Sequence, residues 1–332
     1  MKVIEFLLLP ASFCYGFIMM IRNLLFDMGI LAHERFEVPV ISIGNLSMGG
    51  TGKTPHIEYL IRLLSGGYRV STLSRGYGRE SEGFILATQE SDVKTIGDEP
   101  LQYIRKFSGI KVAVDEKRVH GIHKLLEKFP DLDIILLDDA YQHRYVKPGL
   151  SILLTDYHQL YKEDFVVPSG RLREFRYGAC RADIIIVTKT PKIFSPITRR
   201  GILEKLNPKT HQKVFFSYIK YGDPVSVYNG ASSHFPNRMT SLLLFTGIAN
   251  DYPLKEHISR YCSDIKTIKF TDHHQYTIED AEMIKKTFYD MPTQSKVIIT
   301  TEKDVMRLKT PELTPLIKDL PLFYLQIGRA HV

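Results

Sequence analysis

The sequence predicts an α/β fold in which helices cover both faces of a doubly wound, mostly parallel sheet. Two observations lead to this prediction. Short continuous apolar runs recur along the chain, and segments with the apolar spacing of helices separate them. Such runs are typical of parallel strands buried on both faces, and ligands of these sheets bind at the carboxyl ends of the strands.

The first series of elements begins with a strand at 38–43, which a glycine-rich loop and a helix at 53–64 follow. Gly66 and Gly67 end this helix, because glycine favours helix termination. The same pattern then predicts further strands at 69–73, 111–114, 133–137, 151–155 and 183–188.

A second, smaller α/β domain is predicted after a loosely patterned stretch at 207–237 that contains turn pairs such as Asp223-Pro224. Its strands are expected at 242–245, 265–270 and 296–300, and its helices at 253–261 and 278–288. We therefore place a domain boundary near residue 225.

The expected organisation has four parts. They are an N-terminal membrane-associated helix at 1–32, a nucleotide-binding domain at 33–225, a smaller domain at 226–326 and a tail at 327–332. The tail continues none of the predicted elements, and one codon string for it matches a common sequencing adapter. We therefore expect it to be non-native.

Composition excludes several classes of protein. The 332-residue chain is 44% hydrophobic, which is enough for a sizeable core. Its three cysteines, Cys14, Cys180 and Cys262, lie far apart and form no C-x-x-C pair. A disulfide framework and a zinc site are therefore not expected, and a reducing compartment fits best.

Positive charge is concentrated in one segment. The chain has a formal net charge of +7, but residues 168–220 hold twelve Lys or Arg against three Asp or Glu, which is a local charge of +9. Such a segment suggests an anionic partner: nucleic acid, an acidic membrane surface or a phosphorylated substrate. A solvated basic face remains the alternative.

The N-terminal region contains an uncharged apolar run from Phe6 to Ile21. The run is short for a membrane-spanning helix, which needs about 20 apolar residues. It also lacks the basic start and the cleavage site of a signal peptide. We expect a helix at the membrane interface, with a buried core helix as the alternative.

A phosphate-binding loop is predicted between the first strand and the first helix, where the sequence reads Gly49-Gly50-Thr51-Gly52-Lys53-Thr54. Glycines allow backbone N–H groups to converge on phosphate, the lysine reaches the β- and γ-phosphates, and the following hydroxyl ligates Mg²⁺. The strict pattern has glycine where this chain has Ser47. The alternative is a glycine-rich turn before an ordinary helix, which would not explain Lys53 and Thr54 together.

Acidic and histidine side chains follow several of the predicted strands. Asp138 and Asp139 end an apolar strand, as Walker-B carboxylates that hold Mg²⁺ do. Asp98 and Glu99 stand just before a helix, where a capping role is the alternative. Asp272-His273-His274 lies in the second domain, and an Asp–His pair suits deprotonation of an attacking hydroxyl.

Two further loops carry arginines beside glycines, at 74–79 and 168–174. Guanidinium groups on such loops are suited to phosphate recognition. Simple surface charge is the competing interpretation.

Taken in order, these motifs resemble those of the tetraacyldisaccharide 4'-kinase family, the lipid A kinases. The motifs that carry the resemblance are the apolar N-terminal segment, Gly44-Asn45, Gly49 to Pro55, Ser74 to Tyr77, Gly97 to Pro100, Asp138 to Arg144, Gly170 to Glu174, Asp272 to His274 and Thr301 to Asp304. The family tolerates a hydroxyl residue at the Ser47 position, and Ala140 stands where it usually has glycine. The match extends to about residue 325.

The resemblance implies an ATP-dependent lipid kinase that phosphorylates the 4'-hydroxyl of tetraacyldisaccharide 1-phosphate in lipid A biosynthesis. It implies ATP and Mg²⁺ as cofactors, a lipid A disaccharide precursor as substrate, and a place at the cytoplasmic face of the inner membrane. The N-terminal helix would hold the protein on the membrane surface. Neither nucleic acid nor an obligate protein partner is expected.

The resemblance also assigns roles to residues. Lys53 contacts the β- and γ-phosphates, and Asp98 paired with His273 corresponds to the proposed base; His273 is preferred to His274 because it directly follows Asp272. The expected metal ligands are Thr54, Glu99, Asp138 and Asp139. The expected catalytic residues are Asp98, His273, Lys53 and Arg171, and the nucleotide is held by residues Gly49 to Thr54. The expected substrate-binding residues are Asn45, Arg75, Tyr77, Gln142, His143 and Arg173.

Two other functions remain open on the residues alone. A P-loop switch ATPase or GTPase would hydrolyse nucleotide slowly and phosphorylate no acceptor. A nucleic-acid-dependent ATPase would draw on the basic segment, and DNA or RNA would stimulate it with a steep salt dependence.

Overall fold

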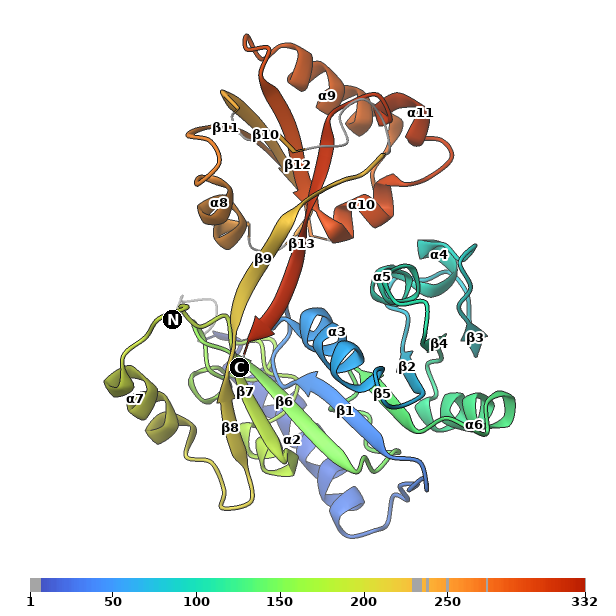
Figure 1. The fold of residues 1–332 in the computed structure, drawn as a ribbon. Coiled ribbons are helices and arrows are strands. Elements are labelled where there is room, and N and C mark those ends of the chain that lie inside the picture. The colour runs from blue at the N-terminus through green and yellow to red at the C-terminus, as the bar shows by residue number, and fades with distance from the viewer. Residues whose placement is uncertain (1–6, 229–234, 237–238, 249–250, 273, 332) are drawn as a thin grey trace. The chain divides into compact units, whose positions relative to one another are not determined.

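The computed structural model describes residues 7–228, 235, 236, 239–248, 251–272 and 274–331, with side chains as far as Gln326. The chain forms two compact units (Figure 1). One consists of Met1–Ile219 with Arg329–Val332, and the other of Lys220–Gly328. The expected boundary near residue 225 falls within β9 (Tyr218–Ser226).

The first unit is built on an eight-stranded sheet with the order β3-β4-β2-β5-β1-β6-β7-β8. The strands are β1 (Val40–Asn45), β2 (Val70–Ser74), β3 (Ile85–Leu86), β4 (Lys111–Val114), β5 (Ile134–Asp138), β6 (Leu150–Asp156), β7 (Ile184–Thr188) and β8 (Lys213–Phe216). Every pairing is parallel except that of β3 with β4. The predicted doubly wound, mostly parallel sheet is therefore confirmed.

Helices cover both faces of this sheet. They are α2 (Leu9–Asp27), α3 (Lys53–Leu64), α4 (Val93–Ile96), α5 (Asp98–Lys106), α6 (Arg118–Lys128) and α7 (Pro196–Leu206), with short 3-10 turns at Tyr161–Glu163 and Arg176–Arg181. Ile122 of α6 packs in a core with Leu73 and Ile135, and Leu206 of α7 packs in a second core with Leu153. The helix α3 contacts β1 and β5.

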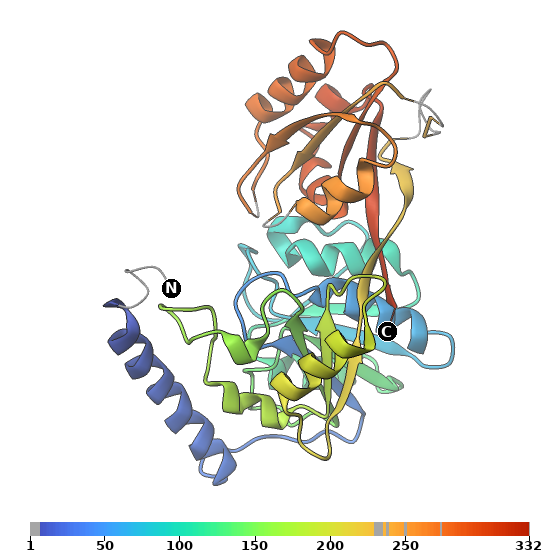
Figure 2. The ribbon, with the colours of Figure 1, turned by 90° about the vertical axis from the view of Figure 1, so that its left-hand side faces the viewer.

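The helix α2 begins with Pro10 in its first turn and continues unbroken for 19 residues (Figure 2). Its buried residues are Ser12, Gly16 and Phe26, whereas the side chains of Phe13, Phe17, Ile18, Met20, Ile21 and Leu24 are exposed. An exposed apolar helix face of this size is unusual for a water-facing surface.

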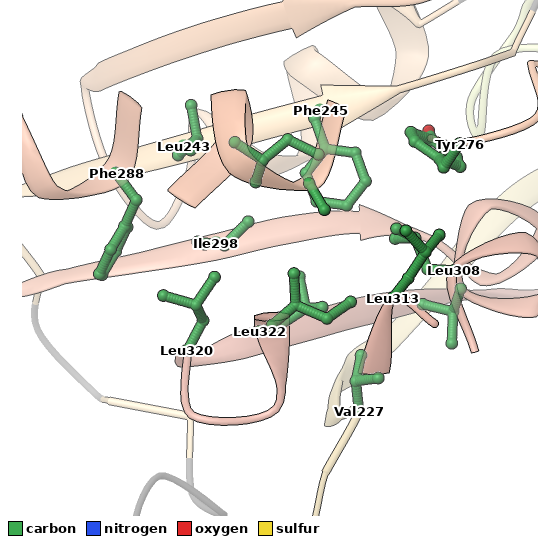
Figure 3. Close-up of a cluster of buried hydrophobic side chains, with 14 of the residues drawn as sticks. Val227, Leu243, Phe245, Tyr276, Phe288, Ile298, Leu308, Leu313, Leu320 and Leu322 are labelled. Atoms are coloured by element: carbon green, nitrogen blue, oxygen red, sulfur yellow. The ribbon is translucent and has the colours of Figure 1, made fainter. Parts of the chain in front are cut away.

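The second unit holds a five-stranded sheet with the order β11-β10-β12-β13-β9, whose further strands are β10 (Ser241–Thr246), β11 (Asp264–Lys269), β12 (Lys296–Thr301) and β13 (Leu322–His331). The helices are α8 (Tyr252–Ile258), α9 (Ile278–Tyr289), α10 (Glu302–Leu308) and α11 (Thr314–Ile317). Leu243, Phe245, Ile298 and Phe288 share a buried core between the sheet and α9 (Figure 3).

The C-terminal residues correct one expectation. We expected 327–332 to continue no element, but β13 extends to His331. The reason is that β13 has β9 as a strand neighbour, and backbone pairing can prolong a strand where the side-chain pattern gives no signal.

Candidate active site

The phosphate loop joins the end of β1 at Asn45 to the start of α3 at Lys53. Gly49 and Gly52 have φ angles of +103° and +86°, in the left-handed region that favours glycine. Gly52 is the residue that caps α3, so the first N–H groups of this helix point into the loop. A helix N-terminus of this form attracts phosphate.

Asn45 holds the phosphate loop through two side-chain hydrogen bonds. Its side chain is fully buried, and Nδ2 donates to Thr51 Oγ1 at 2.9 Å and to the Gly49 carbonyl at 3.4 Å. In this structure the Asn45 amide is thus bound to the loop itself, although the residue was predicted to contact the substrate.

Asp138 lies at the end of β5 and is 4% exposed. Tyr103 of α5 donates its hydroxyl proton to Asp138 Oδ2 at 3.0 Å. Burial, with the negative charges of Glu99 and Asp139, raises the pKa of Asp138 to about 6. The other oxygen, Oδ1, is buried and has no hydrogen-bond partner among the described residues.

Asp139 follows with a φ angle of +48°, a conformation that turns its side chain away from the line of the strand. Its carboxylate lies 3.5 Å from Lys53 Nζ and accepts from Arg173 Nη1 at 3.2 Å. The loop at 168–174 therefore meets the phosphate loop at the carboxyl end of β5, which is the end at which ligands of such sheets bind.

A hydrogen-bond network extends from this point to α2. Gln142 Nε2 donates to the Asn45 carbonyl at 2.9 Å and to Glu174 Oε1 at 3.2 Å. Glu174 is buried, and it also accepts from Asn23 of α2 at 2.6 Å and from both terminal nitrogens of Arg181. The N-terminal helix is thus attached directly to the residues around Asp139.

The acidic pair at 98 and 99 occupies the first turn of α5, immediately after Gly97, whose φ angle is +86°. Asp98 is buried. The hydrogen bond from Tyr103 to Asp138 joins α5 to the end of β5. Burial and then the negative charge of Glu99 raise the pKa of Asp138.

The remaining predicted substrate residues lie around the same edge of the sheet. Arg171 pairs through Nε with Asp164 Oδ2 at 3.3 Å, and Arg75 and Tyr77 are exposed. His143 Nε2 accepts from the Arg118 backbone N–H at 3.3 Å. Burial, with the positive charges of Arg118, Arg22 and Arg75, lowers the pKa of His143 to about 4, so its imidazole is neutral near pH 7.

Sequence reasoning missed three residues of this region. Arg118 is 3% exposed, and burial lowers the pKa of its guanidinium to about 10, while the charges of Asp138 and Asp139 act to raise it. The signal that could have identified it is its place just after the strand at 111–114. Tyr103 was missed as the partner of Asp138, and Glu174 as the partner of Gln142, because each contact joins residues that are far apart in the sequence.

The predicted Asp–His pair lies in the second unit and is only partly described. His273 lies outside the described residues. His274 is held by Asp280, whose Oδ2 lies 2.7 Å from Nε2, and its ring stacks on Phe270 with the centroids 4.7 Å apart. Asp280 is also the capping-box residue of α9. His274 is therefore engaged in holding its own loop.

The donor set fits a magnesium ion only as a partial site. Among the described residues, no three His, Cys, Asp or Glu side chains form a cluster that could hold a metal ion. However, Mg²⁺ usually binds through one or two carboxylates with water and substrate phosphates, so a preformed trio is not required. The buried Asp138 Oδ1 that lacks a partner is one such carboxylate oxygen.

Two cavities open beside His143 in the first unit. One, of about 450 Å³, is lined in part by Phe26 of α2, Arg144 and Arg181. The other, of about 660 Å³, is lined in part by Ala32, Val119 and Tyr145. His33 lines both cavities. The larger cavity also reaches Arg118.

The fold and the loop at Gly49–Thr54 define a P-loop nucleotide-binding protein. The family model described as tetraacyldisaccharide-1-P 4'-kinase matches residues 4–329. The chain therefore belongs to the tetraacyldisaccharide-1-P 4'-kinase family and is a kinase, as the resemblance predicts.

Individual relatives agree with this assignment. The chain is 47% identical over 331 residues to the tetraacyldisaccharide 4'-kinase of Bacteroides thetaiotaomicron, with 95% of this chain and 87% of the relative covered. It is 46% identical to the enzyme of that name from Flavobacterium johnsoniae, with 97% and 93% covered. The crystal structure of LpxK from Aquifex aeolicus in complex with ATP superposes with a TM-score of 0.73 at 27% identity, with 97% and 93% covered.

Proposed function

We propose that the protein transfers the γ-phosphate of ATP to the 4'-hydroxyl of tetraacyldisaccharide 1-phosphate, a step of lipid A biosynthesis. The observation that carries the proposal is the contact between Lys53 and Asp139, with Arg173 on the same carboxylate. It brings the lysine of the phosphate loop, the acidic end of β5 and the basic loop at 168–174 to one place. Phosphoryl transfer needs this combination of positioning and charge neutralisation.

In this proposal the backbone N–H groups of Gly49 to Thr54 bind the β- and γ-phosphates, and Lys53 exchanges its contact with Asp139 for the phosphate oxygens. Arg173, already beside Asp139, then lies within reach of the transferred group. Arg171 is assigned a catalytic role at the developing charge; its guanidinium is about half exposed and accessible to substrate.

Thr54, Glu99, Asp138 and Asp139 are the residues that would hold Mg²⁺. When bound, the ion would neutralise charge on the phosphates and orient them. Tyr103 supports this arrangement by fixing the orientation of the Asp138 carboxylate.

Asp98 and His273 are proposed to remove the proton from the 4'-hydroxyl. The neighbouring His274 is committed to Asp280 and Phe270, which leaves His273 as the histidine of the pair for this role. A positioned base of this type contributes about 10²–10⁴-fold to rate.

Arg75, Tyr77 and His143 are proposed to bind the acceptor, together with Asn45 and Gln142 through the loop that they support. Burial first, and then the positive charges of Arg118, Arg22 and Arg75, lower the pKa of His143. These arginines supply positive charge that suits a phosphorylated sugar. The two cavities beside His143 offer apolar side chains, such as Phe26 and Val119, to the acyl chains.

We further propose that the protein works at the cytoplasmic face of the inner membrane and binds its surface through α2. Within the described part of the chain, Leu9–Asp27 is the helix long and apolar enough to cross a bilayer. Its exposed apolar side chains suit a helix that lies at the membrane interface. The protein would bind its acylated substrate at this membrane surface.

The deciding experiment incubates the protein with γ-labelled ATP, Mg²⁺ and a tetraacylated disaccharide 1-phosphate in mixed micelles. Label in the lipid supports the kinase proposal. Hydrolysis without lipid labelling would indicate a switch ATPase or GTPase instead. Stimulation of hydrolysis by DNA or RNA, lost at high salt, would indicate a nucleic-acid-dependent ATPase.

A further inference from the structure

Side chains from outside the phosphate loop bind two of its carbonyl groups. Thr188 at the end of β7 donates from Oγ1 to the Thr51 carbonyl at 2.9 Å. His56 Nδ1 lies 2.7 Å from the Gly52 carbonyl. Thr188 belongs to the sheet and His56 to α3, so both donors stand on regular elements of the fold.

These bonds determine where the loop N–H groups point. A trans peptide unit is planar, so its carbonyl and its N–H point in opposite directions. Holding the Thr51 carbonyl therefore orients the N–H of Gly52, and holding the Gly52 carbonyl orients the N–H of Lys53. Because Gly52 lies in the left-handed region and has no side chain, its own conformation provides little of this restraint.

The second nitrogen of His56 anchors the ring. Nε2 lies 3.0 Å from Ser217 Oγ, and the imidazole is 5% exposed. A carbonyl can only accept, so Nδ1 carries the proton and Nε2 accepts from the Ser217 hydroxyl. Ser217 is itself held in the sheet, since its N–H donates to the Val187 carbonyl at 2.8 Å and its carbonyl accepts from the Thr190 N–H at 3.0 Å.

We propose that His56 is a positioning residue of the phosphate loop. Its ring is fixed by Ser217 of the sheet and in turn fixes the peptide between Gly52 and Lys53. This inference rests on the proposed binding of ATP phosphates by Gly49 to Thr54. Without the His56 side chain the Gly52 carbonyl keeps only the first bond of α3, from the backbone N–H of residue 56. The peptide between Gly52 and Lys53 is then held less firmly, which weakens the preorganisation of the N–H groups for phosphate.

The test compares His56→Leu with His56→Asn in the full-length protein. Leucine fills the space but donates nothing, whereas the asparagine Nδ2 occupies the place of the imidazole Nδ1 and can still donate to the Gly52 carbonyl. ATP affinity is measured by calorimetry without lipid, and KM for ATP and kcat by lipid phosphorylation. Thermal unfolding of each variant shows whether the fold is retained.

We expect His56→Leu to raise the Kd and KM for ATP about tenfold, as loss of one buried hydrogen bond implies, with a smaller change in kcat. His56→Asn should restore ATP affinity to within about threefold of the wild type, and Ser217→Ala should show an intermediate loss. His211→Leu, at an exposed histidine, should change neither quantity.

Unchanged ATP affinity in His56→Leu would overturn the inference. Equal losses of affinity in His56→Leu and His56→Asn would also overturn it, because packing rather than the donor would then matter. A wild type that binds ATP but labels no lipid would refute the proposed function alone, since the calorimetric comparison would still decide the role of His56.

Discussion

Tyr103 and Asp138 form a buried hydrogen bond, in which the phenol donates to Oδ2 at 3.0 Å, between the helix α5 and the end of β5. The bond attaches the helix that begins with Asp98 and Glu99 to the strand that ends at Asp138, just before Asp139. It therefore links two groups of acids that lie far apart in the sequence.

Tyr103→Phe should lower the free energy of unfolding by about 1–2 kcal/mol, because a buried carboxylate oxygen loses its donor while the ring is kept. Denaturant unfolding at pH 7.5 measures this change. Tyr77→Phe is the matched control, since Tyr77 is 70% exposed, and it should alter stability by less than about 0.5 kcal/mol. Equal changes in the two variants would contradict the importance of the buried bond.

Lys53→Ala should lower kcat for lipid phosphorylation by at least about 10²–10³-fold, because it removes the positive charge proposed to bind the transferred phosphate. Labelled-lipid assays at saturating ATP measure the effect. Lys189→Ala removes a lysine that pairs with Asp156, and it should leave kcat nearly unchanged. A Lys53→Ala enzyme with wild-type turnover would refute the assignment of the phosphate loop.

His273→Ala should lower kcat by about 10²–10⁴-fold if the residue acts as the base. His274→Ala should instead lower the unfolding temperature, because the imidazole holds Asp280 and stacks on Phe270, and it should affect kcat much less. Paired kinetic and thermal measurements on the two variants test this division. Similar kcat losses at wild-type stability would show that the choice between the histidines is wrong.

The contribution of His143 to the stability of the protein should fall as the pH drops below about 6.5, opposite in sign to that of Asp138, whose raised pKa adds stability as the pH falls below about 6. The pKa of His143 is about 4 in the folded protein and near 6.5 when unfolded, so between these values the unfolded chain binds a proton that the folded chain does not. The stabilising effect of the neutral imidazole is complete above pH 6.5 and is lost toward pH 4.

His143→Gln removes this titration but keeps an amide oxygen that can accept from Arg118. Its unfolding temperature should therefore decline less steeply than that of the wild type between pH 6.5 and 4.5. Parallel slopes for the two proteins would show that His143 is not the group responsible.

Replacing Phe13, Phe17 and Ile18 by serine should weaken binding to vesicles that contain anionic lipid, because these exposed side chains provide the apolar face of α2. Vesicle sedimentation measures the effect, and thermal unfolding checks that the fold survives. Deleting residues 1–26 should have the same effect, but it also removes Asn23, so the serine variant is the cleaner test. Unchanged partitioning of the serine variant would refute the anchoring role.

Much of the fold was predictable because its strands are buried on both faces and so appear as continuous apolar runs. β5 (Ile134–Asp138) and β7 (Ile184–Thr188) are examples. β8 (Lys213–Phe216) was missed because it lies at the sheet edge, where exposed and half-buried residues alternate. Local patterns therefore identify central strands better than edge strands.

The site was predictable only as a set of motifs. The glycine pattern and the acids after 133–137 identify the residues, but Lys53–Asp139, Arg173–Asp139 and Tyr103–Asp138 are tertiary contacts that no local spacing specifies. Likewise, nothing in the sequence near His56 indicates that Ser217 would be its partner.

The attachment of α2 through Asn23 to Glu174 has a consequence for inhibition. A compound that displaced α2 would leave the buried Glu174 with one donor fewer and would disturb Gln142, which supports both Asn45 and Arg173. It would do so without entering the phosphate loop. With α2 on the membrane surface, as proposed above, such an inhibitor would act from the lipid side, and high cellular ATP would not compete with it.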